Sequence, residues 1–165
     1  MLALTLLAGF IIYEIAQYND IRKTQSKIQS DLKTANLIIV TDSNVPMGKQ
    51  FFQLVQNEKE FVSVFPELTE NIIKIKSQTD IDKIIGSLVL KRKEQENCRC
   101  NGSHYLGFYH DMELLGIILI KHAACIKYID KNNKYSSQYY LKKSDMSEIT
   151  KVLKEHKIDL KQTQN

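Results

Sequence analysis

The longest hydrophobic run outside the N-terminus lies between Cys98 and Asp130, where apolar runs alternate with short polar or small turns. This spacing predicts antiparallel strands over about His104–Tyr109, Leu114–Lys121 and Ala124–Ile129. Apolar residues along the middle run are continuous rather than alternating, which predicts a central strand covered on both faces. We expect the rest of the chain to pack around this sheet or to attach it elsewhere.

Shorter runs on either side predict additional strands. Segments 37–40, 72–76 and 135–141 carry β-branched or aromatic residues next to turn-forming residues. The period of segment 51–56 is undecided between strand and helix, and segment 61–65 is more strand-like. We expect these last two segments to close the second face of the sheet.

Two stretches have the 3.6-residue period of an amphipathic helix. The first covers about 80–92, where Lys91, Arg92 and Lys93 suit the negative end of the helix dipole better than a phosphate site. The second covers about 146–156, after the capping-box spacing of Asp145 to Glu148. The predicted fold is therefore α+β, with an antiparallel sheet of about five or six strands packed by these two helices.

The N-terminal stretch 1–18 is apolar apart from Thr5, Glu14, Gln17 and Tyr18. A membrane-spanning helix needs about 17–20 such residues. A transmembrane anchor is favoured over a cleaved signal, which needs a basic start and a small-x-small cleavage site. It is also favoured over a core helix, because the apolar residues are not confined to one face.

The predicted domain organisation follows from this pattern. Residues 1–18 form the anchor or signal, 19–35 a weakly striped helical stalk, and 36–165 a single α+β domain. Basic residues such as Arg22 and Lys23 follow the apolar run, so the positive-inside rule places the domain in the cytoplasm. An upstream basic residue would reverse that orientation, and both sides of the membrane stay open.

Composition indicates a globular protein and argues against a nucleic-acid-binding one. The chain has 165 residues, of which 43% are apolar and 25% charged, values typical of a globular protein. Its net charge of +4 is dispersed, and it contains no Trp. A nucleic-acid partner usually requires a basic stripe with stacking aromatics, so composition argues against one.

The candidate chemistry lies in a cysteine and histidine cluster. Cys98, Cys100, His122 and Cys125 have the ligand types that zinc prefers, although C-x-C is not the usual knuckle spacing. Cys125 paired with either earlier cysteine in a disulfide, and a thiol–imidazole nucleophile, are the alternatives. Buried cysteine with turn histidines is the plainest interpretation. No phosphate loop, zinc-protease or serine-hydrolase motif occurs in the chain.

The same stretch resembles a set of uncharacterised small bacterial proteins. Their core is C-x-C-x-G…Y…L…H-[HG]-x-x-[IL]-[RK]-[WY], and this chain is similar to it at Cys98-x-Cys100-x-Gly102, Phe108-Tyr109, Leu114-Leu115, His122 and Ile126-Lys127-Tyr128. Those proteins often carry an export or lipoprotein signal, and the resemblance implies no known activity. Ala123 stands where a second His is common, and Tyr128 where Trp is common.

We therefore expect a membrane-tethered, small α+β accessory or binding domain without enzymatic activity. Its partners would be the membrane, through residues 1–18, and another protein. The alternative is a metal- or thiol-dependent activity centred on Cys98, Cys100, His122 and Cys125, with zinc as the cofactor.

Overall fold

A computed structural model describes residues 2–42, 72–93, 104–111, 113–121, 125–132, 134–158 and 160. Over these residues the chain forms a seven-stranded sheet and three helices. Every strand pair is antiparallel. The α+β class is confirmed, and the sheet is larger than the five or six strands that the sequence predicts.

The strands follow the apolar runs closely. In chain order they are β1 (Leu37–Asp42), β2 (Ile73–Ile75), β3 (Leu90–Lys93), β4 (His104–His110), β5 (Glu113–Ile120), β6 (Cys125–Asp130) and β7 (Tyr135–Leu141). The three strands predicted between Cys98 and Asp130 are β4, β5 and β6, and the flanking runs form β1, β2 and β7. Segments 51–56 and 61–65 lie outside the described residues.

The sheet has a meander at its centre and shorter strands at both edges. Its order is β2-β1-β4-β5-β6-β7-β3. Strands β4 to β7 follow one another in sequence, as antiparallel neighbours joined by short turns usually do. Strand β1 adds to the free side of β4, and β3 returns to pair with β7 at the opposite edge.

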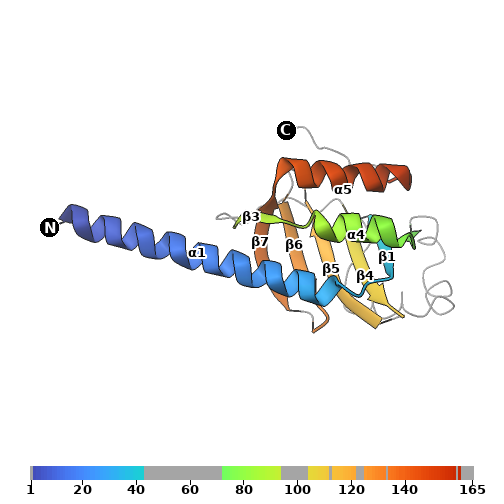
Figure 1. Ribbon diagram of the computed structural model, residues 1–165, viewed down its shortest axis with the longest axis horizontal. Helices are drawn as coiled ribbons and strands as arrows, with labels where there is room; N and C mark the ends of the chain where they lie inside the picture. The colour runs from blue at the N-terminus through green and yellow to red at the C-terminus, as the bar shows by residue number, and fades with distance from the viewer. Residues whose placement is uncertain are drawn as a thin grey trace.

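The helices are α1 (Leu2–Leu32), α4 (Gln78–Gly86) and α5 (Lys143–Glu155). Helices α4 and α5 and the C-terminal half of α1 lie over one face of the sheet, while the N-terminal half of α1 projects away from it (Figure 1). The core between helices and sheet includes Ile81 and Ile84 of α4 and Ile149 and Val152 of α5. Burial of such side chains contributes about 1.5–3 kcal/mol each.

The second face of the central strands is buried as well. On β5, Ile117 and Ile118 point to opposite faces, yet they are only 4% and 0% exposed. Ile39 of β1 and Ile129 of β6 are also buried. This confirms the prediction that the continuous apolar run of β5 forms a strand covered on both faces.

The first predicted helix is shorter than its apolar period indicates. Residues 80–92 were expected to be helical, but α4 ends at Gly86 and residues 90–93 form the edge strand β3. Glycine is a poor helix former, and the backbone N–H of Ser87 closes the last turn. Lys91 is therefore on an edge strand, not at a helix C-terminus, and the dipole interpretation of the basic run is wrong.

The second predicted helix begins earlier than its capping signal indicates. Helix α5 starts at Lys143, and its N-cap is Lys142, which makes no side-chain capping bond. Asp145 lies in the first turn, where the positive end of the helix dipole stabilises a carboxylate. The capping box starting at Asp145 is thus wrong, although the apolar face of the helix is confirmed.

Candidate interaction surface on the N-terminal helix

The N-terminal half of α1 exposes large apolar side chains. The exposed residues are Leu7, Phe10, Ile11, Ile12, Tyr13, Ile15 and Tyr18, with exposed fractions between 48% and 68%. We call this set the apolar arm. Monomeric soluble proteins rarely expose a contiguous apolar patch of this kind without a binding role.

The apolar arm is not confined to one side of the helix. Successive residues turn by about 100°, so the consecutive residues Phe10, Ile11, Ile12 and Tyr13 lie on four different sides. A helix that is apolar on all sides requires an apolar surrounding rather than a single flat contact. The arm is therefore suited to insertion into an apolar phase or a bundle.

The C-terminal half of α1 behaves differently, because it belongs to the domain core. Ile28 and Leu32 are fully buried against the sheet, and Ile21 packs at the edge of the same cluster. Arg22 and Lys23 face solvent. This half is amphipathic, and the segment expected to form a stalk packs on the sheet.

Polar contacts also hold this half of α1 to strand β7. The hydroxyl of Tyr139 donates to Asp20 Oδ2 at 3.0 Å. Its oxygen lies 3.0 Å from Thr24 Oγ1. Because the tyrosine proton is used on Asp20, the threonine hydroxyl is the donor in the second bond. Two successive turns of α1 thus meet one buried tyrosine.

Gln25 joins α1 to the segment that leads into β3. Its Nε2 donates to the carbonyl oxygen of Leu88 at 2.7 Å, and its Oε1 accepts from the N–H of Leu90 at 2.7 Å. Both backbone groups belong to buried residues. The side chain therefore satisfies a donor and an acceptor that would otherwise be costly to bury.

A third contact lies nearer the end of α1. Tyr128 Oη donates to Asp31 Oδ2 at 2.6 Å, and Lys27 Nζ lies 2.8 Å from the same oxygen. Lys27 also lies 3.4 Å from Asp130 Oδ2. Lys27 and Asp31, on one face of α1, thus contact Tyr128 and Asp130 of β6.

Electrostatics at this contact follow from those distances. The hydrogen bond to Asp31 raises the pKa of Lys27 above its ordinary value. Burial, followed by the bond to Asp31, raises the pKa of Tyr128. Burial alone would raise the pKa of Asp130, but hydrogen bonds from the Lys134 N–H and Lys27 lower it. Lys27 and Asp130 therefore stay charged at neutral pH.

These anchoring residues do not stand out in the sequence as a functional motif. Asp20, Thr24, Lys27 and Asp31 recur at intervals of three and four, which places them on one side of a helix. That stripe indicates a polar face, but not which strand it contacts. The pairing depends on β6 and β7, which are far away in the chain.

The expectation of a transmembrane anchor at 1–18 is corrected by the structure. Over the residues that the structure describes, no helix is both long and apolar enough to cross a membrane. Helix α1 continues without a break into an amphipathic half that is part of the core.

The candidate metal and thiol site is described at one of its four positions. Cys125 opens β6 and is buried, with 1% of its surface exposed. Cys98, Cys100 and His122 lie outside the described residues. Among the described residues no group of three or more His, Cys, Asp or Glu is placed to hold a metal ion. The zinc, disulfide and nucleophile hypotheses all stay predictions.

Comparison with known proteins adds no family to this picture. No family model, curated protein or solved structure matches the chain.

Proposed function

We propose that this chain is an accessory protein that attaches to a lipid bilayer by insertion of the apolar arm, without spanning it. The observation that carries the proposal is the exposure of large apolar side chains on every side of the N-terminal half of α1. The α+β domain is the part that remains in water and is available to a protein partner.

The helix from residue 2 to residue 13, which carries most of the apolar arm, has a length that suits one leaflet. Residues 2–13 form about 18 Å of helix at about 1.5 Å per residue, against about 15 Å for half of a bilayer's hydrocarbon core. Glu14 then lies near the head groups. Tyr13 and Tyr18 flank it, and tyrosine is enriched at this depth because its ring is apolar and its hydroxyl polar.

Vesicle flotation of the full chain tests this proposal. The wild-type chain should float with phosphatidylcholine vesicles, and the double variant Phe10→Asp/Ile12→Asp should remain at the bottom of the gradient. Each aspartate placed in hydrocarbon costs roughly 3 kcal/mol, so two of them reduce partitioning by more than about a hundredfold.

A matched control adds the same charge to another helix. Ser144 and Ser147 are exposed on α5, so Ser144→Asp/Ser147→Asp should float like wild type. Circular dichroism of all three proteins establishes that the fold is kept. A wild-type chain that stays in solution, or forms a defined oligomer through the arm in place of floating, contradicts the proposal.

A further inference from the structure

Basic side chains gather at the edge of the domain from which α1 projects. Strand β3 is the last strand of the sheet and pairs with β7, with Leu90 opposite Leu141. Lys142 and Lys143 follow Leu141 directly, so they lie just past the end of β7, next to the start of β3, where Lys91 follows Leu90. All three lysines are exposed.

Helix α1 brings two further cations to the same edge. Gln25 contacts the backbone of Leu90, which fixes this part of α1 beside the start of β3. Arg22 and Lys23 precede Gln25 by less than one turn and are both exposed, Arg22 on nearly the same side of the helix as Gln25 and Lys23 on its outer side. We call Arg22, Lys23, Lys91, Lys142 and Lys143 the basic edge.

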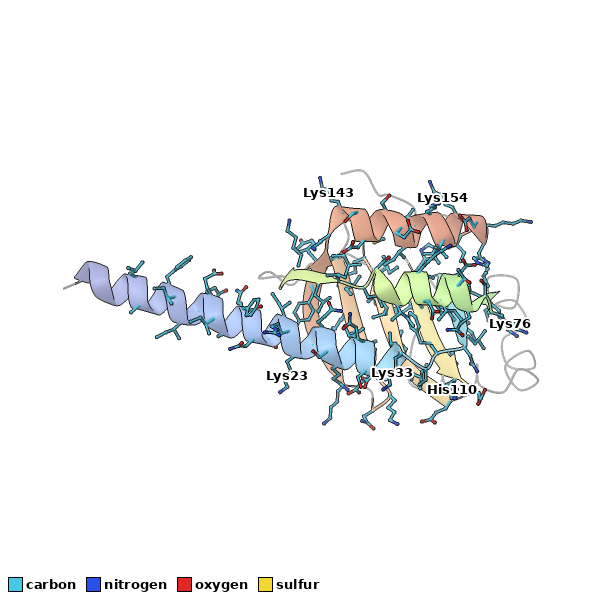
Figure 2. All side chains as sticks on the ribbon, viewed as in Figure 1. Lys23, Lys33, Lys76, His110, Lys143 and Lys154 are labelled. Carbon is cyan, nitrogen blue, oxygen red and sulfur yellow. The ribbon has the colours of Figure 1, made fainter. Side chains whose placement is uncertain are left out.

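The position of the basic edge relative to the apolar arm is visible in the figures. Strands β3 and β7 are the strands nearest to the projecting half of α1 (Figure 1). Lys23 and Lys143 lie toward that side, whereas Lys76 and Lys154 lie toward the opposite side of the domain (Figure 2). When the arm inserts, this edge is therefore the part of the domain that faces the bilayer surface.

The acidic neighbours of this edge are fewer than its cations. Asp20, which accepts a hydrogen bond from Tyr139, and Asp145, which accepts one from Ser144 Oγ at 3.1 Å, are two carboxylates against five basic side chains. Arg22 lies over the ring of Tyr18, 5.6 Å from its centroid, which keeps its guanidinium next to the arm. Positive charge thus begins where the apolar surface ends.

We propose that the basic edge binds the head groups of anionic phospholipids, and so orients the domain on a negatively charged bilayer. This inference rests on the proposed attachment through the apolar arm and adds the lipid class. An anionic surface attracts each nearby Lys or Arg strongly enough to raise affinity by about fivefold.

Binding to two vesicle compositions tests the inference. The wild-type chain should bind vesicles with about 30 mol per cent phosphatidylserine at least tenfold better than pure phosphatidylcholine. Lys91→Gln/Lys142→Gln/Lys143→Gln should remove most of that advantage and leave binding to phosphatidylcholine unchanged. Salt at about 1 M, where the Debye length is about 3 Å, should likewise remove most of the preference of the wild-type chain for phosphatidylserine vesicles.

A control variant separates position from net charge. Lys76→Gln/Lys151→Gln/Lys154→Gln removes as many exposed lysines, from the far side of the domain, and should keep the preference for anionic vesicles. Equal losses in both triple variants would overturn the inference. A competition with duplex DNA, at equal phosphate concentration, gives a second test. The inference would also be overturned if DNA displaced the wild-type chain from the vesicles but did not displace the variant Lys91→Gln/Lys142→Gln/Lys143→Gln.

The two proposals fail separately in these experiments. The attachment itself is refuted if the wild-type chain does not bind phosphatidylcholine vesicles and the variant Phe10→Asp/Ile12→Asp binds every vesicle composition as well as the wild-type chain does. If the arm variant loses binding but the wild-type chain does not distinguish the two lipid compositions, attachment stands and the basic edge is refuted.

Discussion

Gly116 on β5 shows how one residue sets the contact between sheet and helix. A Cβ atom at this position would lie 2.7 Å from both Cε2 and Oη of Tyr128, closer than real Cβ contacts allow. The bare backbone therefore lets the hydroxyl end of the Tyr128 ring lie against β5. From there its hydroxyl reaches Asp31 on α1.

We expect Gly116→Ala to lower the free energy of unfolding by about 1–3 kcal/mol, because the ring must move away from well-packed neighbours. Urea denaturation measures this. Gly86→Ala is the control: nothing lies within 4 Å of its added Cβ, and alanine suits the end of α4 better. That variant should be unchanged or more stable by up to about 1 kcal/mol. Equal destabilisation of the two variants would refute the steric argument.

A second single-residue effect is electrostatic and joins α4 to α5. His156 Nε2 lies 3.1 Å from Asp80 Oδ2. The hydrogen bond with His156 lowers the pKa of Asp80, helped by Ser77 and Lys83 and opposed by burial. A carboxylate with a lowered pKa in the folded state adds stability above its unfolded pKa of about 4. That stability disappears as the pH falls through the folded-state value.

The free energy of unfolding should therefore decline between about pH 5 and pH 2 by about 1 kcal/mol more in wild type than in Asp80→Asn. Denaturant titrations at several pH values measure the difference. Asp82→Asn, on the same helix, should keep the wild-type pH dependence. Parallel curves for wild type and Asp80→Asn would show that the contact adds no acid-sensitive stability.

At the scale of elements, β3 depends on a side chain from α1. It is a four-residue edge strand whose ladder partner is β7 alone among the described strands. Short edge strands open easily, because one side of their backbone lacks a partner. Gln25 compensates by binding the backbone on both sides of residue 89.

Gln25→Ala should destabilise the start of β3 by about 1–3 kcal/mol, because a buried N–H and a buried carbonyl lose their partner. Hydrogen exchange should show faster exchange at Leu90 and unchanged protection in β5. Gln29→Ala, an exposed glutamine one turn further along α1, is the matched control and should leave Leu90 protected. Unchanged exchange at Leu90 in Gln25→Ala would mean that pairing with β7 suffices to hold β3.

Helix α1 is a single element with two environments. Its C-terminal half is fixed to β6, β7 and the segment before β3 by the contacts of Asp31, Tyr139 and Gln25. Its N-terminal half carries the apolar arm. Because the helix is continuous, a surface that holds the arm would also hold the domain at a defined angle.

At the scale of the whole molecule, the apolar arm and the basic edge lie on the same side of the domain. Helix α1 projects from the side of the domain where β3 and β7 lie, and α4 and α5 cover one face of the sheet (Figure 1). Both faces of the central strands are buried, so the sheet contributes to binding through its edges and turns. We therefore place the proposed lipid contact at one end of the domain, and leave the remaining surface to a protein partner.

The candidate sites differ in how far the sequence predicts them. The apolar character of the arm is evident along residues 2–13, because it needs no partner segment to be recognised. The basic edge is not, since Lys23, Lys91 and Lys143 are separated along the chain and lie on one side of the domain only through β3–β7 pairing and the Gln25 contact. The proposed metal cluster stays a sequence prediction.

Local sequence pattern is sufficient to predict the central meander β4–β6, the adjoining strand β7 and helix α5. These elements arise from local apolar periodicity and short turns, so neighbouring residues carry the signal. Contacts between distant segments overrode two other predictions, a helix that reaches residue 92 and a stalk over 19–35. Residues 90–93 became a strand because β7 offered an edge, and the weak stripe of α1 became core because Ile28 and Leu32 met the sheet. Both outcomes depend on burial between distant segments, which local periodicity does not encode.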